Sequence, residues 1–326
     1  MSLYPLKFKT IYKETIWGGS KLKEQLNKDV PTNAKVGETW EISCVEGDVS
    51  IVSNGILEGN SLQDLIEIYM GDLVGDKVYD KYGLEFPVLI KFIDANDDLS
   101  IQVHPDDAMA RKRHNAFGKT EMWYILESKK DSKLISGFSK TVTKREYLDK
   151  LEANEISDIL NFEPAKKGDV FFIPAGRVHA IGSGILLAEI QQTSDITYRI
   201  YDWDRKNKDG NGRELHTELA IDVLDFKKHD NYKTEYTTQD NEAVELANTE
   251  YFKTNIIELT KKMEIDIFKI DSFIIYIATE GETEIIYSTK DSISIKKGEI
   301  VLIPAELNSI ILNPKSKSCT LLEVYM

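Results

Sequence analysis

Short stretches of alternating or continuous apolar residues recur along the chain, with turn-forming residues between them. Five of these stretches lie around Trp40, Val88, Ile101, Trp123 and Leu187. Runs of this length, bounded by Gly, Pro, Asn or Asp, are typical of β-strands. About six more follow at close spacing after residue 242, a pattern that predicts a small antiparallel barrel or jelly roll. The chain is therefore expected to be mainly β.

Two stretches have helical spacing instead, at residues 61–78 and 143–160. They begin with Ser61 and Thr143, and both residue types favour the N-cap position of a helix. We expect two helices that cover the flank or the end of the β-structure.

One strand-turn-strand unit occurs twice, as KGDVFFIPAGRVH at residues 167–179 and as KGEIVLIPAELNS at residues 297–309. Only the first copy ends in a histidine, because Ser309 stands opposite His179. The polar stretch at residues 225–242 lies between the copies and is the best linker candidate. We predict a metal-binding catalytic domain with helical excursions at residues 1–235, and a β-barrel without metal ligands at residues 236–326.

The composition excludes several classes of protein. With 326 residues, 41% hydrophobic and 29% charged, the chain resembles ordinary soluble globular protein with enough length for two cores. No apolar run approaches the roughly 18 residues of a membrane span, and the N-terminus lacks the apolar segment of a signal peptide. The net charge of −14 argues against a broad nucleic-acid surface. Cys44 and Cys319 are too few for a disulfide framework, so a reducing cytoplasm fits best.

Four residues could together hold a metal ion. Gln102 and His104 are two positions apart on a predicted strand, so their side chains point to the same face. Taken alone, two such residues are more often a half-buried polar pair than a metal site. Glu121 opens another predicted strand, and His179 ends the first copy of the repeat. Two imidazoles, a carboxylate and an amide oxygen suit Zn²⁺, although manganese, iron or cobalt would also bind.

Charged residues near these motifs suggest a phosphorylated substrate. Lys91, Lys119 and Arg199 would make a locally basic pocket in an acidic protein, although each alone is more commonly part of a surface ion pair. Glu189 lies in an apolar strand, where an unpaired carboxylate would be costly. It should therefore have a partner or a chemical role.

The first copy of the repeat has the form Gly168, five residues, Pro174, one residue, Gly176, two residues, His179. This form resembles the second sequence motif of the cupin β-barrels. Six segments also lie in a characteristic order along the chain: WGG at residues 17–19, GETWEIS, LSIQVHPDD, GKTEMWYI, PAGRVHAIG and AEIQQTSDITYRIYD. Their order and spacing are similar to those of the type I phosphomannose isomerases, in the short bacterial form without the large helical insertion.

This resemblance covers nearly the whole chain. It implies a bicupin fold, that is, two jelly-roll β-barrels with a few flanking helices. It also implies one Zn²⁺ ion per chain and the reversible conversion of mannose 6-phosphate to fructose 6-phosphate. The expected partner is thus a phosphorylated hexose, with neither nucleic acid nor membrane.

The resemblance also implies roles for individual residues. The zinc ligands of the family fall on Gln102, His104, Glu121 and His179, the four residues chosen above from their chemistry. The residues implied in catalysis are Arg199, Glu189 and Lys119. Those implied in holding the substrate or its phosphate are Lys91, Ser100, Lys119, Glu38 and Asp195.

The chain departs from related patterns at two places. Gly118 stands where the long-form members have a histidine, which shifts the role of proton-transfer base towards Glu189. Burial of Glu189 in an apolar strand is expected to raise its pKa towards neutrality. Compared with general cupins, Glu121 lies 17 residues after His104, so residues 109–117 are expected to form an inserted helical excursion.

The implied reaction moves a proton from C2 to C1 of the open sugar through a cis-enediol. A metal can act as a Lewis acid or hold the substrate, and Arg199 can stabilise the enediolate. Two other functions stay open at this point. A bicupin oxygenase or decarboxylase usually needs three histidines, which Gln102 argues against, and a non-catalytic sugar-phosphate sensor would not need Lys119, Glu189 and Arg199 together.

Overall fold

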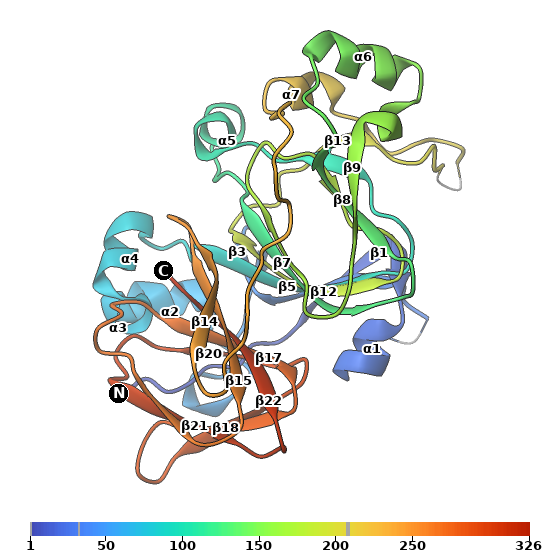
Figure 1. The fold of residues 1–326 in the computed structure, drawn as a ribbon. Helices are drawn as coiled ribbons and strands as arrows, with labels where there is room; N and C mark the ends of the chain where they lie inside the picture. Colours follow the sequence, from blue (N-terminus) through green and yellow to red (C-terminus); the bar gives the residue numbers. More distant parts are fainter. Residues whose placement is uncertain (1, 32, 207–208) are drawn as a thin grey trace.

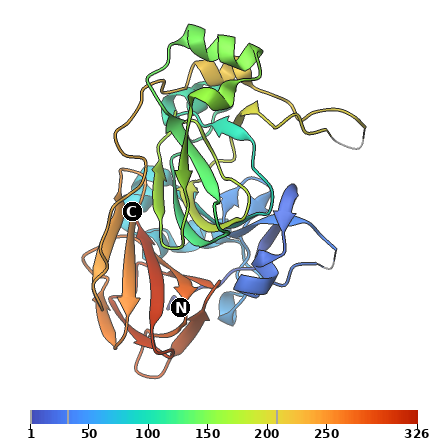
Figure 2. The same cartoon turned by 45° about the vertical axis from the view of Figure 1, so that its right-hand side comes forward.

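The computed structural model describes residues 2–31, 33–206 and 209–326. Two β-sandwiches, each made of two facing sheets, dominate the molecule (Figure 1), and a turned view separates the red and orange C-terminal sandwich from the green one above it (Figure 2). The expected mainly β fold is confirmed, and its two sandwiches are consistent with a pair of jelly-roll barrels. Both chain ends lie at the C-terminal sandwich (Figure 1).

The N-terminal sandwich contains a six-stranded and a five-stranded antiparallel sheet. The order in the six-stranded sheet is β1 (Ile11–Gly19), β2 (Val36–Ile42), β5 (Val88–Ala95), β12 (Ile185–Gln192), β7 (Glu121–Ser128) and β10 (Val170–Ile173). The order in the five-stranded sheet is β13 (Tyr198–Tyr201), β6 (Ile101–Val103), β11 (His179–Ala180), β8 (Lys133–Phe138) and β9 (Leu160–Pro164). All five strands expected in this half are present.

The C-terminal sandwich confirms the small antiparallel barrel expected after residue 242. One sheet has the order β14 (Ala243–Asn248), β15 (Lys253–Leu259), β22 (Cys319–Tyr325), β17 (Ile274–Glu280) and β20 (Ile300–Ile303). The other has the order β16 (Met263–Asp266), β21 (Ser309–Pro314), β18 (Glu282–Ile286) and β19 (Ser292–Lys296). β14, β16 and β21 were not expected. β14 and β16 are edge strands that expose several of their residues, and β21 is a short strand without a long apolar run.

The helix expected at residues 61–78 is divided into α2 (Leu62–Tyr69), α3 (Gly71–Val74) and α4 (Asp76–Tyr82). Ser61 caps α2 in a capping box with Asp64, as its residue type suggested. The expectation of one continuous helix is wrong because Met70 and Gly75 have positive φ angles of 46° and 93°. A Cβ atom on Gly75 would lie 2.4 Å from the carbonyl oxygen of Asp271, so the chain turns where only glycine fits.

The helix expected at residues 143–160 forms only in its first part, because the chain leaves the helix after Glu152 and Asn154 has a positive φ angle of 59°. Thr143 caps α6 (Lys144–Glu152), which a 3₁₀ turn, η2 (Ile156–Ile159), follows. The inserted excursion is α5 (Asp107–His114). The remaining short elements are α1 (Lys21–Leu26), α7 (Thr217–Ile221), η1 (Gly55–Leu57), β3 (Cys44–Val45) and β4 (Asp48–Val49). None of the helices in the described ranges is long and apolar enough to cross a membrane.

The two sandwiches pack through their larger sheets and share one hydrophobic core. A single cluster contains Phe92 of β5 and Ala188 of β12 together with Ile275 of β17 and Leu322 of β22. The N-terminal segment also contacts the C-terminal sandwich through its backbone, because Leu6 forms two backbone hydrogen bonds with Leu302 of β20, at 2.8 and 2.9 Å. The division at residues 235 and 236 stays a prediction.

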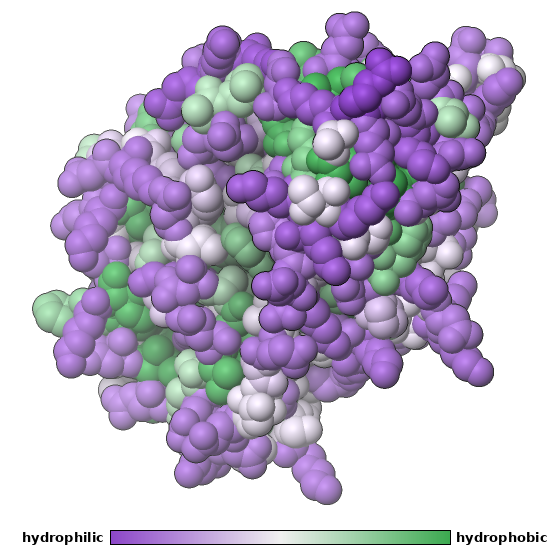
Figure 3. Space-filling view, turned by 45° about the horizontal axis from the view of Figure 1, so that its top comes forward, coloured by the Kyte–Doolittle hydropathy of each residue, from purple (hydrophilic) through white to green (hydrophobic). Residues whose placement is uncertain are grey.

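The segment predicted as a linker lies against the N-terminal sandwich. The hydroxyl of Tyr232 is buried and donates to the carbonyl of Phe138 at 2.8 Å, and Thr234 forms a bridge with Val170. Neither helix nor strand forms at residues 226–242, apart from isolated bridges. Hydrophilic residues cover most of the face seen in Figure 3, with smaller hydrophobic groups between them.

Candidate functional site

Two rows of side chains face each other inside the N-terminal sandwich. In the six-stranded sheet, Glu189 of β12 is the cross-strand neighbour of Lys91 on β5. In the five-stranded sheet, Gln102 of β6 lies between His179 of β11 and Arg199 of β13. Glu189, Lys91, Gln102 and Arg199 line one cavity of about 160 Å³. Regular pairing of short strands thus brings together residues that are up to 108 positions apart.

A buried group of possible metal ligands lies at the inner end of this cavity. His104 follows β6, Glu121 opens β7 and His179 opens β11, and their ligand atoms all lie within 4.8 Å of one another. The Oε1 atom of Glu121 is 3.3 Å from Nε2 of His179, and its Oε2 atom is 3.6 Å from Nε2 of His104. Burial, with the charge of Glu189 adding to it, raises the pKa of Glu121 to about 8.

The inward-facing atoms of these three residues lack hydrogen-bond partners. The Nδ1 atoms of His104 and His179 each lie 2.8 Å from a backbone carbonyl, of Ile196 and Arg177, and donate to it. In the described part of the chain, neither Nε2 atom and neither oxygen of Glu121 makes a hydrogen bond. Unpaired buried polar atoms are costly, and one cation would satisfy all four. The residues present therefore fit a metal ion.

Burial also keeps the two imidazoles in the form that binds metal. It lowers the pKa of His104 well below the ordinary value and that of His179 to about 4. Both rings are therefore neutral at physiological pH, as metal coordination requires. Half-buried Gln102 lies beside His179 in the cavity wall, where its amide can supply an uncharged oxygen.

Glu189 has partners on both sides. Its Oε2 atom accepts a hydrogen bond from the indole N–H of Trp123 at 2.8 Å, and its Oε1 atom lies 3.2 Å from Nζ of Lys91. Nζ of Lys91 is also 3.4 Å from Glu38. Burial acts to lower the pKa of Lys91, but the carboxylates of Glu38 and Glu189 raise it above its ordinary value. The lysine is therefore charged at neutral pH.

The expectation that burial raises the pKa of Glu189 is wrong. Burial acts in that direction, but the charges of Lys91 and Lys119 and the N–H of Trp123 hold the pKa of Glu189 below its ordinary value. A buried carboxylate with two nearby ammonium groups is more stable ionised than protonated. Glu189 is therefore a carboxylate at neutral pH.

Lys119 and Gly118 lie between α5 and the metal ligands. Nζ of Lys119 is buried and lies 3.5 Å from Oε2 of Glu121. The backbone N–H of Gly118 donates to the carboxylate of Asp107 at 2.8 Å. A Cβ atom on Gly118 would lie 2.5 Å from the backbone of Asp106. This position therefore has no room for the histidine of the long-form pattern.

Arginines gather at the outer end of the cavity. Nε of Arg199 lies 3.3 Å from the hydroxyl of Ser100, and its Nη1 donates to the carbonyl of Glu214 at 2.9 Å. Arg213 lines the same cavity, and two of its nitrogens donate to the carboxylate of Asp202. The sequence analysis missed Arg213, because it follows an irregular polar segment that no periodic pattern places near the strands.

The structure brings every sequence-predicted site residue to this region. The cavity is lined by Glu38, Lys91, Ser100, Gln102, Lys119, Glu189, Asp195 and Arg199, and the other three metal-site residues lie at its inner end. The residues that sequence reasoning missed in the lining include Trp17, Trp40, Thr197 and Arg213. Trp17 and Trp40 belong to the quoted segments WGG and GETWEIS, so their place in those segments could have indicated them.

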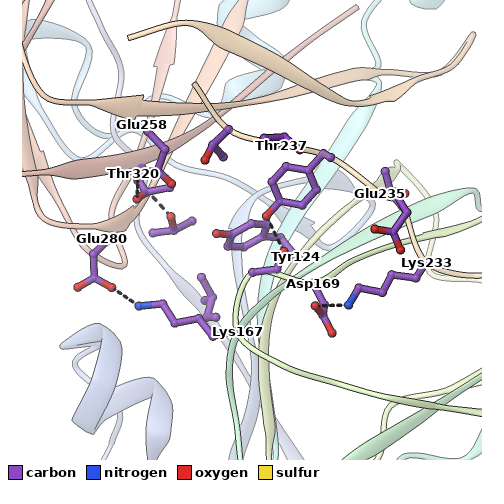
Figure 4. A pocket seen from close by; sticks show the side chains of 15 residues that line it. Tyr124, Lys167, Asp169, Lys233, Glu235, Thr237, Glu258, Glu280 and Thr320 are labelled. Atoms are coloured by element: carbon purple, nitrogen blue, oxygen red, sulfur yellow. Dashed lines mark hydrogen bonds and ion pairs between the residues drawn. The ribbon is translucent and has the colours of Figure 1, made fainter. Parts of the chain in front are cut away.

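A larger cavity, of about 680 Å³, lies between the sandwiches (Figure 4). Its wall carries Tyr124, threonines and the ion pair between Lys167 and Glu280, at 2.7 Å. Among the described residues, its lining includes neither a histidine nor a member of the His-Glu-His group. The smaller cavity is therefore the candidate active site, because reactive groups and unpaired ligand atoms converge there.

The C-terminal sandwich repeats part of the site. Glu323 of β22 lies between Tyr276 of β17 and Asn255 of β15, as Glu189 lies between Trp123 and Lys91. The hydroxyl of Tyr276 and the amide of Asn255 each donate to Glu323 at 2.8 Å. Its carboxylate is thus fully paired by neutral groups, without a lysine.

Comparisons with known proteins agree with the geometry. A family model described as phosphomannose isomerase type I, catalytic domain, matches residues 5–131. A mannose-6-phosphate isomerase of Bacillus subtilis is 37% identical over 310 residues, which are 93% of this chain and 94% of that protein. A mannose-6-phosphate isomerase of Streptococcus mutans is 40% identical over 224 residues, 69% of each chain.

A solved structure also matches the fold. The crystal structure of a mannose 6-phosphate isomerase from Bacillus subtilis superposes with a TM-score of 0.88 and covers 99% of both chains, at 30% sequence identity. The similarity thus includes both sandwiches and the connections between them.

Proposed function

The chain belongs to the type I mannose-6-phosphate isomerases, and from this premise we propose that it works with one bound divalent metal ion and through a cis-enediol intermediate. The observation that carries the metal proposal is the buried group of His104, Glu121 and His179, whose inward-facing atoms have no hydrogen-bond partners. The sugar is mannose 6-phosphate in one direction and fructose 6-phosphate in the other.

The proposed ligands are His104, Glu121, His179 and the amide oxygen of Gln102, with Zn²⁺ as the ion. Neutral imidazoles, one carboxylate and one amide form a mixed nitrogen and oxygen set that zinc accepts. When bound, the ion supplies Lewis-acid polarisation of the substrate oxygens. The backbone carbonyls that hold each Nδ1 would orient the two rings.

Glu189 is the proposed proton-transfer base between C2 and C1. Its carboxylate is ionised at neutral pH, so it can accept the proton without first losing one. The N–H of Trp123 orients it at 2.8 Å, and the ammonium of Lys91 lies 3.2 Å away. A charged lysine in a buried site would stabilise the negative charge that develops on the enediolate oxygens.

We also propose a reducing, cytoplasmic location. Both Cys44 and Cys319 carry free thiols, and burial raises the pKa of each. Protonated, partly shielded thiols suit a compartment in which disulfides do not persist.

Removal and return of the metal tests the proposal. Protein stripped by a chelator should lose the conversion of mannose 6-phosphate, measured by coupling fructose 6-phosphate to a dehydrogenase, and one equivalent of Zn²⁺ should restore it. Elemental analysis of the protein as purified gives a second readout that does not depend on turnover. Full activity in protein shown to be metal-free would exclude the metal, and a folded, zinc-loaded protein without turnover would favour a sugar-phosphate sensor.

A further inference from the structure

The two ends of the active-site cavity differ in their charge. At the inner end, Lys91 lies within 3.4 Å of Glu38 and Glu189, and Lys119 lies 3.5 Å from Glu121. Each ammonium group there already faces carboxylates. A phosphate group at this end would compete with those carboxylates for the lysines, and it would take the place beside the proposed metal ion that C1 and C2 need.

The outer end carries arginines that lie away from the proposed metal ion and from the reacting carbons. Three arginines, Arg199, Arg205 and Arg213, lie around Asp202, whose side chain is 6% exposed. Asp202 accepts hydrogen bonds from Arg205 and from Arg213. Arg205 and Arg213 share this one buried carboxylate. Arg199 is held by neutral partners, the hydroxyl of Ser100 and the backbone carbonyl of Glu214, and the side chain of Glu214 is 83% exposed, so solvent screens its charge. An excess of positive charge remains beside the cavity.

The separation of the two ends suits the length of the substrate. His179, Gln102 and Arg199 are direct neighbours on three adjacent strands, β11, β6 and β13. Two strand spacings separate the backbone of His179 from that of Arg199 by about 10 Å. An open six-carbon chain that ends in a phosphate has a comparable reach. If C1 and C2 lie between the metal ligands and Glu189, the phosphate on C6 extends towards Arg199.

We propose that Arg213, together with Arg199 and Ser100, binds the phosphate group of the substrate, and that Asp202 holds the Arg213 guanidinium in place. This deepens the proposed function and rests on it. The phosphate is then at the arginine end, and the buried lysines act on the reacting oxygens. This exchanges the roles expected from sequence for Arg199 and Lys91, and it leaves Lys119 with the catalytic one of its two expected roles. Arginine suits this position because its planar fork can make paired hydrogen bonds to phosphate oxygens.

Arg205 provides a matched control. It shares Asp202 with Arg213 and carries the same charge, but it lies outside the lining of the active-site cavity. Arg205→Gln and Arg213→Gln therefore remove the same charge and one arginine partner of the same carboxylate. A general change in charge, or a weakened loop, would affect both variants alike.

The test compares three proteins, wild type, Arg213→Gln and Arg205→Gln, in steady-state kinetics and in direct binding. Arg213→Gln should raise the KM for mannose 6-phosphate by about tenfold to hundredfold, the loss expected for one charge-assisted contact, with a much smaller change in kcat. The inhibition constant of inorganic phosphate should rise by a similar factor. Arg213→Lys should recover part of the loss. Arg205→Gln removes only a charge outside the cavity lining, so it should raise the KM and the inhibition constant of phosphate much less than Arg213→Gln.

Calorimetric titration of the metal-loaded proteins, all at the same metal content, with inorganic phosphate supplies a readout that needs no turnover. Weaker phosphate binding in Arg213→Gln alone supports the proposal. Unchanged phosphate binding in Arg213→Gln, or equal weakening in Arg205→Gln, would overturn it. Wild-type protein that binds phosphate through Arg213 but converts no sugar phosphate would contradict the proposed function and leave this subsite intact.

Discussion

At the scale of single residues, the pairing of each buried charge decides its chemistry. Glu189 and Glu323 occupy equivalent places on β12 and β22, and both are buried. Glu189 has a lysine neighbour where Glu323 has the amide of Asn255. From sequence, Glu189 was expected to have a charged or hydrogen-bonding partner, because it lies in an apolar strand. Its ionisation state was not, because Lys91 reaches it only through strand pairing.

Glu189→Gln should lower kcat by at least about a hundredfold, since it removes the proposed base, and this range is typical for loss of a general base. Metal content should stay at the wild-type level because Glu189 is not among the proposed ligands. The matched control is Glu323→Gln, which makes the same change at the equivalent place in the C-terminal sandwich and should keep wild-type kcat. A Glu189→Gln enzyme with near-normal turnover would assign the proton transfer to another group.

A buried hydroxyl without a hydrogen-bond partner, that of Tyr147 in α6, is expected to lower the stability of the protein. Its side chain is fully buried, and its hydroxyl has no hydrogen-bond partner in the described part of the chain. Tyr147→Phe should therefore increase the free energy of unfolding by about 1 kcal/mol. Tyr232→Phe is the control, because the hydroxyl of Tyr232 donates to the carbonyl of Phe138, and its loss should destabilise the fold.

Because of Tyr147, the free energy of unfolding is expected to depend on pH in the alkaline range. Burial raises the pKa of Tyr147 above its ordinary value of 10.0. Above that ordinary value the unfolded chain ionises while the folded chain does not, so stability falls as pH rises. Denaturant titrations at neutral pH and near pH 10.5 should show a smaller decline for Tyr147→Phe than for wild type. An equal decline in both proteins would mean that Tyr147 ionises alike in the folded and unfolded states.

At the scale of elements, local pattern predicted most strands and the capped starts of α2 and α6. Residues 61–78 show the limit of local pattern, because the apolar spacing of a helix continues through Met70 and Gly75 although both have positive φ angles. At Gly75 the chain passes close to the backbone of Asp271, which leaves no room for a side chain. Gly118 lets the start of α5 pack against the segment that leads into β7, because a side chain at position 118 would displace the backbone of Asp106. These close contacts are made between different segments of the chain, so the local pattern of apolar and polar residues cannot predict them.

At the scale of the whole molecule, the shared core makes the two sandwiches one structural unit. Leu322 of β22 belongs to the cluster that joins both halves, whereas Leu321 belongs to the cluster inside the C-terminal sandwich. All four tryptophans belong to the N-terminal sandwich: those at positions 17, 40 and 123 lie on its strands, and the one at position 203 packs against it. Tryptophan fluorescence therefore reports on the N-terminal sandwich alone, and circular dichroism reports on both.

Leu322→Ala should lower the free energy of unfolding by about 2–5 kcal/mol and should shift the fluorescence and circular dichroism transitions together. The reason is that the cavity opens in a core that both sandwiches share. Leu321→Ala, on the opposite face of the same strand, should also give coincident transitions if the molecule unfolds as one unit. A fluorescence transition that stays in place in both variants would show that the sandwiches unfold independently.

The sequence by itself determined the mainly β class and the duplicated strand-turn-strand unit, because alternation and turn residues act over a few positions. Its resemblance to a known family indicated many of the residues that line the cavity, but not Arg213. Only the tertiary structure decided how those residues affect one another. It brought Lys91 to Glu189 and reversed the expected direction of the pKa shift, and it placed Arg213 beside Arg199 and Ser100. Charge interactions and steric contacts act through space, so they depend on distances that exist only after the two sheets have closed over the cavity.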